Sequence, residues 1–123
     1  MGSIFYLSQQ SGEMFDMGQV TGLDKLAHFT LYGLLAATVI FAQSPLRRQH
    51  VPQRVSWLTV IVCLVYGLSD EWHQSFVPGR DVSGADVVAD LLGAIVAAGL
   101  WLCWRRWRAR LARVRDLELG RND

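Results

Sequence analysis

The chain alternates between long apolar stretches and short polar ones. Three apolar segments run roughly from Leu26 to Ala42, from Val55 to Ser69 and from Ala85 to Trp104. A helix needs about 20 residues to cross the hydrocarbon core of a bilayer, with a lower limit of about 17. The third segment is long enough to cross, and the first is only just long enough. The second is long enough only if its polar continuation, Asp70–Gln74, is also helical. The pattern predicts three transmembrane helices, at about 24–42, 55–74 and 84–104.

A soluble helical bundle is the alternative, and the pattern argues against it. Its helices would each carry a polar face with a period of 3.6 residues. Neither Leu31–Ala42 nor Val55–Leu68 offers such a face. A chain of 123 residues has room for one domain. We therefore expect a single all-α domain, 1–123, that forms an integral membrane helical bundle of about three transmembrane helices.

Basic residues are strongly segregated along the chain. Ten of the twelve lie either between the first two apolar segments or after the third, which gives formal charges of +7 on that side and −6 on the other. Short loops rich in Lys and Arg stay in the cytoplasm. We therefore expect the C-terminus to be cytoplasmic, with the N-terminal region and the loop around Arg80 on the outer side.

Residues 105–119 form a basic tail. Trp104, Trp107, Leu111 and Val114 recur at intervals of three and four residues, with arginines between them. This spacing is typical of an amphipathic helix that lies on an anionic leaflet. We do not expect nucleic acid to bind, because the same arginines are already explained as topology signals. The two cysteines lie in or at the end of apolar segments without metal-binding spacing, and we expect both to be unreactive.

Polar residues gather at the outer end of each predicted helix. Their intervals of three and four residues place them largely on one face of each helix. Ionisable groups at membrane depth are costly and normally face a bundle interior or a water-filled cavity. Three helices with this pattern at one level predict a shared, wet, outward-facing pocket. By helix, the residues are Asp24, Lys25, His28 and Tyr32; Tyr66, Asp70, Glu71, His73 and Gln74; Asp86 and Asp90.

A purely structural interpretation of these residues stays open. Asp86 and Asp90 fall in the first turns of a helix, where a carboxylate interacts favourably with the helix dipole. Asp24 is placed to cap its helix, and Lys25 to extend toward the headgroups. Arg80 could pair with Asp86, and a carboxylate with a histidine. The convergence of two histidines, several carboxylates and one arginine nevertheless favours a functional site.

The available chemistry is acid–base transfer or binding of a polar group. The acid–base candidates are His28, Glu71 and His73. Arg80 suits a phosphate or carboxylate, because a guanidinium donates two parallel hydrogen bonds. No specific metal-binding spacing is present, so we expect no metal and no cofactor. The remaining binding candidates are Asp24, Lys25, Tyr32, Asp70, Gln74, Asp86 and Asp90.

Several short motifs, taken in order, resemble those of the VanZ-like family. They are Asp24-Lys25-x-x-His28, Asp70-Glu71-x-His73-Gln74, Phe76-Val77-Pro78-Gly79-Arg80 and Asp86-x-x-x-Asp90-x-x-Gly93. The family consists of small bacterial membrane proteins and takes its name from a teicoplanin-resistance protein. The resemblance covers roughly residues 4–100 and implies a multi-pass protein of the bacterial inner membrane. It also implies a further N-terminal helix, truncated or missing here, of which Ile4–Leu7 would be the outer end.

Two functional hypotheses follow from the residues and the resemblance. In the first, the pocket binds or modifies an anionic lipid headgroup or a lipid-linked cell-wall precursor, and thereby influences glycopeptide susceptibility. In the second, the bundle is a non-enzymatic interaction module that alters the access of ligands such as glycopeptide antibiotics to the cell surface. Membrane lipids are expected partners in both. An ion pathway is disfavoured because no polar face continues through the inner halves of the helices.

Overall fold

The computed structural model describes residues 22–76 and 84–119, except for the side chains of Leu23 and Asp24. Within these ranges the backbone forms helices and no strand. Arg80 and the expected N-terminal helix lie outside the described residues. The helices are α2 (Leu23–Ala42), α3 (Pro45–His50), α4 (Pro52–Gln74) and α5 (Gly84–Leu119).

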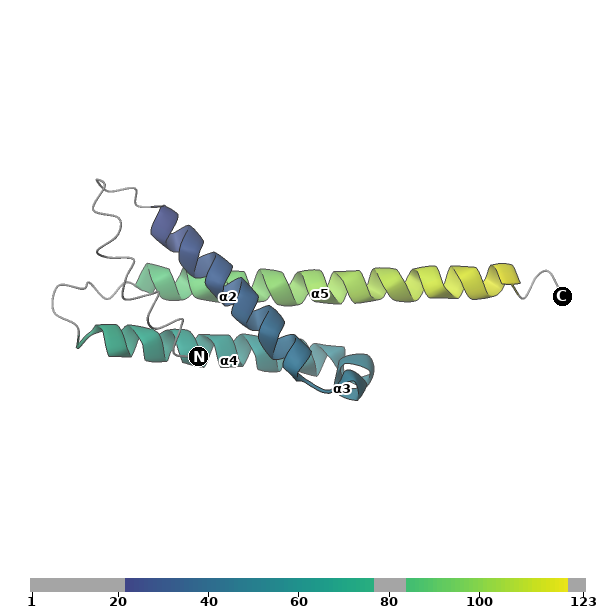
Figure 1. Cartoon of the computed structure of the whole chain (residues 1–123), viewed down its shortest axis with the longest axis horizontal. Helices are drawn as coiled ribbons and strands as arrows, with labels where there is room; N and C mark the ends of the chain where they lie inside the picture. The colour runs from purple at the N-terminus through teal and green to yellow at the C-terminus, as the bar shows by residue number, and fades with distance from the viewer. Residues whose placement is uncertain (1–21, 77–83, 120–123) are drawn as a thin grey trace.

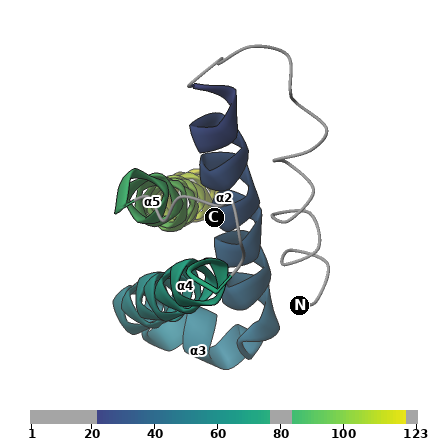
Figure 2. The same cartoon turned by 90° about the vertical axis from the view of Figure 1, so that its left-hand side faces the viewer.

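Two helices form an antiparallel pair that a third crosses. Helices α4 and α5 run side by side in opposite directions, and α2 lies obliquely across both of them (Figures 1 and 2). As a result, the start of α2, the end of α4 and the start of α5 lie toward one end of the bundle. We call this the acidic end, because Asp70, Glu71, Asp86 and Asp90 lie there. The opposite end, with α3, is the basic end.

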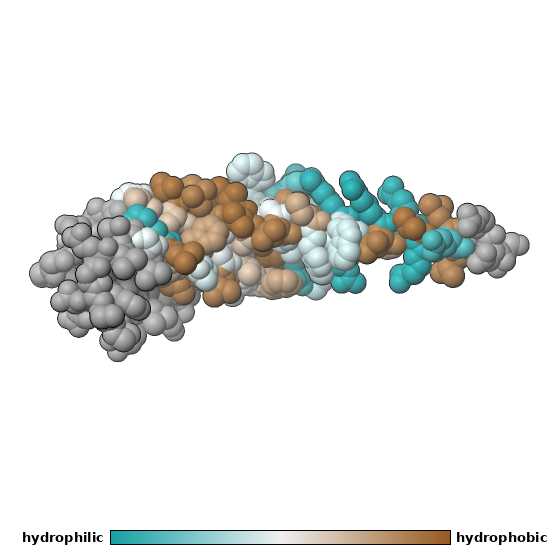
Figure 3. All heavy atoms as spheres, turned by 90° about the horizontal axis from the view of Figure 1, so that it is seen from above, coloured by the Kyte–Doolittle hydropathy of each residue, from teal (hydrophilic) through white to brown (hydrophobic). Residues whose placement is uncertain are grey.

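Three of the described helices are long and apolar enough to span a membrane: α2 from Lys25 to Ala42, α4 over its whole length, and α5. Their outward faces carry large apolar side chains, and Leu34, Val65 and Leu100 are each at least 60% exposed. Apolar surface covers much of the bundle, whereas polar side chains follow the far part of α5 (Figure 3). Such a surface suits lipid rather than water. The predicted all-α membrane bundle of three spanning helices is thereby confirmed.

Helix α5 is longer than a bilayer core. Its 36 residues extend about 54 Å at 1.5 Å per residue, against about 30 Å of hydrocarbon. The sequence analysis divided this stretch into a span and a separate tail, but in the structure the two are one continuous helix (Figure 1). The reason is local, because Trp104–Leu119 contains no proline or glycine that would end the helix. A surface-lying tail would require a bend after Trp104.

The joint between α2 and α4 contains a short helix that the sequence analysis did not predict. The hydroxyl of Ser44 accepts a hydrogen bond from the backbone N–H of Arg47 at 3.4 Å, and Pro45 opens α3. A hydroxyl residue followed by proline is a helix-start signal. Helix α4 likewise begins with a proline, at Pro52 rather than near residue 55. Proline favours the first helical position because the N–H that it lacks would have no partner within the helix.

The helices meet through small residues and a few large ones. Gly93 of α5 lies directly against the backbone of Phe29 in α2. Cys63 is completely buried, while Cys103 is exposed, and neither forms a disulfide. One group of buried core residues is Tyr32, Leu35, Ala36, Cys63 and Ala94, and a second is Ile40, Val55, Ala98 and Trp101.

The basic residues that the sequence places on one side of the membrane lie at one end of the bundle. Arg105 of α5 donates a hydrogen bond from Nη2 to the carbonyl oxygen of Gln49, in α3, at 3.2 Å. This contact joins the loop between the first two spans to the start of the basic tail. The two basic segments therefore share one membrane face, as the charge pattern requires.

Membrane orientation yields a prediction that cysteine labelling tests. In a chain with both native cysteines replaced by alanine, Ser75→Cys should react with an impermeant maleimide in intact cells, because the charge pattern predicts that the acidic end faces outward. Gln49→Cys should react only after the membrane is permeabilised. Both positions are exposed and close to helix ends, so the two reactivities compare directly. The opposite labelling pattern would place the acidic end in the cytoplasm.

Candidate functional site

A buried histidine–carboxylate pair joins α2 to α5 at the acidic end. Nδ1 of His28 lies 3.0 Å from Oδ1 of Asp90. The side chains are only 11% and 3% exposed. Because 62 residues separate the two along the chain, the contact depends on how the helices pack. The pair can share one proton, with a charge-assisted hydrogen bond when His28 is protonated and Asp90 is ionised.

Helix α4 contributes a second buried carboxylate. Asp70 is 3% exposed, and its Oδ2 accepts a hydrogen bond at 2.9 Å from Nε2 of Gln74, one helical turn later. The amide therefore stabilises a carboxylate that the apolar surroundings would otherwise disfavour. Thus each of the three spanning helices carries at least one of the buried polar residues His28, Asp70 and Asp90.

A glycine of α4 makes room for the residues of the other two helices. A Cβ atom at Gly67 would lie 3.1 Å from Oδ2 of Asp90 and 3.6 Å from the hydroxyl oxygen of Tyr32. Tyr32 and Asp90 therefore both approach the backbone of α4 at this glycine. The sequence analysis missed Gly67, although it precedes Asp70 by three residues and so shares its helix face.

Tyr32 brings a hydroxyl group into the site. Its side chain is 1% exposed, and its ring centroid lies 6.3 Å from that of Tyr66. The hydroxyl is buried and has no hydrogen-bond partner among the described residues. A buried hydroxyl normally has such a partner, because leaving the group unsatisfied costs about 1–3 kcal/mol. Within the part of the chain that the structure describes, Tyr32 is therefore a donor without an acceptor, close to Asp90 of the His28–Asp90 pair.

Nearer the membrane surface, Lys25 neutralises part of the negative charge. Its Nζ lies 3.7 Å from Oδ1 of Asp86, and the side chains are 43% and 10% exposed. The sequence analysis offered Arg80 as the partner of Asp86, and Arg80 lies outside the described residues. The ion pair between Lys25 and Asp86 links α2 to α5, as the deeper His28–Asp90 contact does.

Two acid–base candidates on α4 lie on different sides of the helix. Glu71 is 7% exposed and buried within the bundle, whereas His73 is exposed. Residues two apart on a helix are separated by about 200°, so they cannot share a face. Of the three predicted acid–base residues, His28 and Glu71 are thus buried at the acidic end, and His73 lies on its outer surface.

Carboxylates outnumber cationic groups at the acidic end. Four are buried there, and the groups in the described part of this end that carry or can take up a positive charge are Lys25, His28 and the exposed His73. Further positive charge would favour the binding of an anion, and Arg80 belongs to the segment between α4 and α5. The described residues contain no group of three or more ligating side chains arranged for a metal ion. The outward-facing pocket stays a prediction, since the segment that joins α4 to α5 at this end is not described.

Comparisons with known proteins assign the chain to a family. The model of the family described as VanZ/LLP1 matches residues 2–105. An uncharacterized protein of the fission yeast Schizosaccharomyces pombe is 34% identical over 92 residues, which is 74% of this chain. The chain spans about half the length of that curated relative, 54%. No solved structure matches the chain. With most of its length matched by one family model, the chain is a membrane protein of the VanZ/LLP1 family.

Proposed function

We propose that the acidic end binds the polar headgroup of an anionic lipid or of a lipid-linked cell-wall precursor, and exchanges a proton with it. One observation carries the proposal: the buried His28–Asp90 pair at 3.0 Å. Ionisable residues inside a membrane bundle are costly and usually mark a functional site. Three helices contribute to this one, which is more than anchoring a single helix at the interface requires.

Each residue has a role that follows from its position. His28 holds or releases the exchanged proton, and Asp90 fixes the orientation of its ring. The Tyr32 hydroxyl, without a partner among the described residues, donates a hydrogen bond to an oxygen of the headgroup. Arg80 and Lys25 supply the positive charge that an anionic headgroup needs, and Glu71 is the second acid–base group.

The side of the membrane determines which lipids reach the site. The basic loop and tail favour a cytoplasmic position for the opposite end, and we infer that the site faces the outer leaflet of a bacterial inner membrane. A lipid-linked precursor exposed there would connect the site to glycopeptide susceptibility, as the VanZ name suggests. A phospholipid headgroup is the version of the proposal that a fission yeast relative could share, because both kinds of cell contain phospholipids.

A second candidate function is that of a non-enzymatic scaffold. The observation in its favour is the close backbone contact between Gly93 and Phe29, beside the His28–Asp90 pair. In this version the polar residues fix the register of α2 against α5, and the outer surface of the bundle engages the partner. Buried polar pairs can confer such packing specificity.

Replacing His28 with asparagine separates the two candidates. The side-chain amide nitrogen of asparagine can take the place of Nδ1 and still donate to Asp90, but it does not titrate. The phenotype is the change in teicoplanin susceptibility that the wild type confers on a sensitive host. We expect His28→Asn to remain folded and to reduce this change at least tenfold. His50→Asn is the matched control, because His50 is an exposed histidine on α3, and it should behave as wild type.

Co-purifying lipids give a second measurement on the same variants. Mass spectrometry should find the headgroup lipid with the wild type and His50→Asn, and find it depleted from His28→Asn. If His28→Asn retains both phenotype and lipid, while His28→Ala loses both along with its fold, the pair only joins helices and the scaffold candidate is correct.

A further inference from the structure

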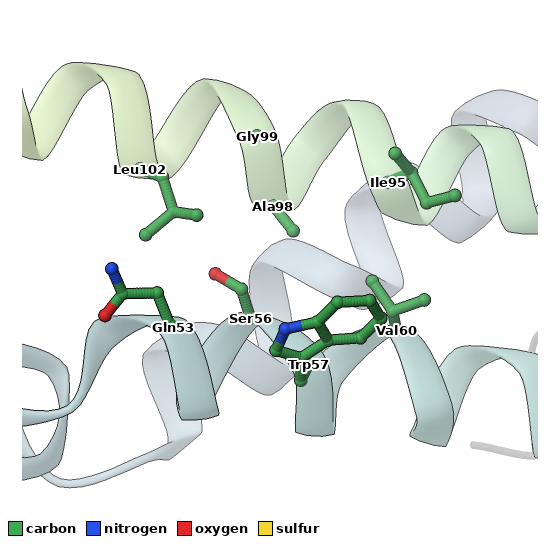
Figure 4. Close-up of a pocket in the computed structure, with 8 residues that line it drawn as sticks. All are labelled: Gln53, Ser56, Trp57, Val60, Ile95, Ala98, Gly99 and Leu102. Carbon is green, nitrogen blue, oxygen red and sulfur yellow. The ribbon is translucent and has the colours of Figure 1, made fainter.

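A groove lies between α4 and α5, toward the basic end and away from the His28–Asp90 pair. Its volume is about 340 Å³, within the range of small-ligand sites. Side chains of Ser56, Trp57 and Val60 on α4 face Ile95, Ala98 and Leu102 on α5 (Figure 4). Gln53 also lines the groove, but nearly all of the surface that lines it is apolar.

The groove lies at the depth of lipid tails. Ala98 is eight residues beyond Asp90 on α5, which places it about 12 Å further along the helix axis. Leu102 ends the groove close to Trp104, where the apolar segment of α5 gives way to arginines. A transmembrane helix is about 10–12 Å wide and far exceeds this volume, whereas a single acyl chain is narrow enough to enter.

Arginines lie just beyond the groove at the basic end. Arg105 follows Leu102 by one turn, and its guanidinium carbon lies 5.4 Å from the ring centroid of Trp101. Nη2 of Arg105 donates to Gln49, but Nη1 is buried and has no hydrogen-bond partner in the ranges 22–76 and 84–119. Arg48 repeats this arrangement over Phe41, at 5.1 Å, with a buried Nε that also lacks a partner there.

No acidic residue lies close to these arginines in the sequence. Residues 43–54 contain three arginines and no carboxylate, and α5 has none from Leu91 until Asp116. A buried donor on a charged group is stabilised by an anionic acceptor, and a guanidinium matches a phosphate best. The apolar groove thus adjoins arginines that can bind an anion. In a phospholipid, the apolar tail adjoins the anionic headgroup in the same way.

We infer that the groove and the adjoining arginines form a binding site for an anionic phospholipid of the leaflet at the basic end. One acyl chain occupies the groove, and the phosphate contacts Arg105 and Arg48. A second copy of the chain is a poor occupant, because the arginine-rich part of α5 next to the groove would repel the same positively charged part of the second copy. This site is independent of the headgroup site proposed at the acidic end.

Native mass spectrometry of the full chain tests the headgroup half of the site. The purified protein is titrated with phosphatidylglycerol or phosphatidylcholine that carry the same acyl chains. Phosphatidylglycerol should bind more tightly, and Arg105→Gln should weaken its binding about fivefold, the usual effect of one basic residue at an anionic membrane. Arg110→Gln is the matched control, with the same charge change further along α5, and should leave binding unchanged.

Filling the groove tests the acyl-chain half. A Cβ atom at Gly99, which lines the groove, would meet nothing within 4 Å, so Gly99→Leu places a side chain there without strain in the helix. It should weaken binding of both lipids, whereas Val96→Leu, one turn away and outside the lining, should not. Circular dichroism confirms that each variant is folded.

Three results of the binding measurements would each overturn the inference. They are equal affinity for the two lipids, an equal loss on Arg110→Gln, or unchanged binding in a folded Gly99→Leu variant. A groove that is covered by a second copy would show itself as a dimer that Gly99→Leu dissociates, and that result also contradicts the inference.

Discussion

Gly93→Ala should destabilise this protein more than any other addition of a single methyl group to a described glycine. A Cβ atom at Gly93 would overlap the carbonyl oxygen of Phe29 and lie 3.0 Å from its carbonyl carbon and 3.2 Å from the backbone nitrogen of Gly33. Backbone atoms cannot move aside as a flexible side chain can, so α2 and α5 must separate. We expect a loss of about 3 kcal/mol in the free energy of unfolding, the upper end of the range for overpacking.

Gly99→Ala is the matched control for this substitution. Both glycines lie within α5, but nothing comes within 4 Å of a Cβ atom at Gly99. Alanine is the better helix former by about 1 kcal/mol, so this variant should be as stable as the wild type or slightly more stable. Unfolding in mixed micelles of mild detergent and SDS measures both. Equal stability of the two variants would show that α2 and α5 do not pack at Gly93.

The same substitution bears on the acidic end. Phe29 follows His28 directly, and Gly93 follows Asp90 by one turn, so the close contact and the hydrogen-bonded pair lie side by side. Nδ1 of His28 lies 3.0 Å from Oδ1 of Asp90. If the helices separate by one ångström, this distance exceeds that of a hydrogen bond. We therefore expect Gly93→Ala to impair any function that requires the His28–Asp90 pair.

Hydropathy and charge predicted the helices and the residues that gather at each end. A transmembrane helix must be apolar over nearly its whole length, so a run of consecutive apolar residues predicts its position. The intervals Asp24–His28–Tyr32 and Asp86–Asp90 also placed each polar residue on a helix face. Structure within a single helix is therefore largely predictable from this sequence. The boundary at Trp104 was one exception, since polarity changes there and helix propensity does not. The short helix α3 and the start of α4 at Pro52 were others, because both lie in a polar stretch that hydropathy does not assign to a span.

Contacts between helices could not be predicted in the same way. Asp86 pairs with Lys25 at 3.7 Å, a contact that the sequence analysis did not propose. His28 could have met any of several carboxylates, and the crossing of α2 over α5 selects Asp90. That crossing depends on glycines at Gly33 and Gly93, whose importance shows only when the partner helix is known. The groove between α4 and α5 also results from helix packing, because neither helix forms a groove by itself.

The His28–Asp90 pair yields the second large effect, measured as a coupling energy. We expect His28→Ala to lower the free energy of unfolding by about 3 kcal/mol, because it leaves Asp90 buried without its partner. Asp90→Ala should cost less, since a neutral imidazole is easier to bury than a carboxylate. The double variant should then cost less than the sum of the single variants by about 2 kcal/mol, more than the average for hydrogen bonds between membrane helices.

The ion pair between Lys25 and Asp86 provides the internal comparison for this cycle. It links the same two helices, but the side chain of Lys25 is 43% exposed, and water screens such pairs so that they contribute about 0–1 kcal/mol. The same cycle with Lys25→Ala and Asp86→Ala should therefore give a coupling energy well below that of the deeper pair. Additive costs for His28→Ala and Asp90→Ala would mean that the two side chains do not interact in the folded protein. A strong coupling energy together with a silent phenotype for His28→Asn would instead assign the pair to helix packing, because the amide preserves the hydrogen bond and removes only the proton exchange.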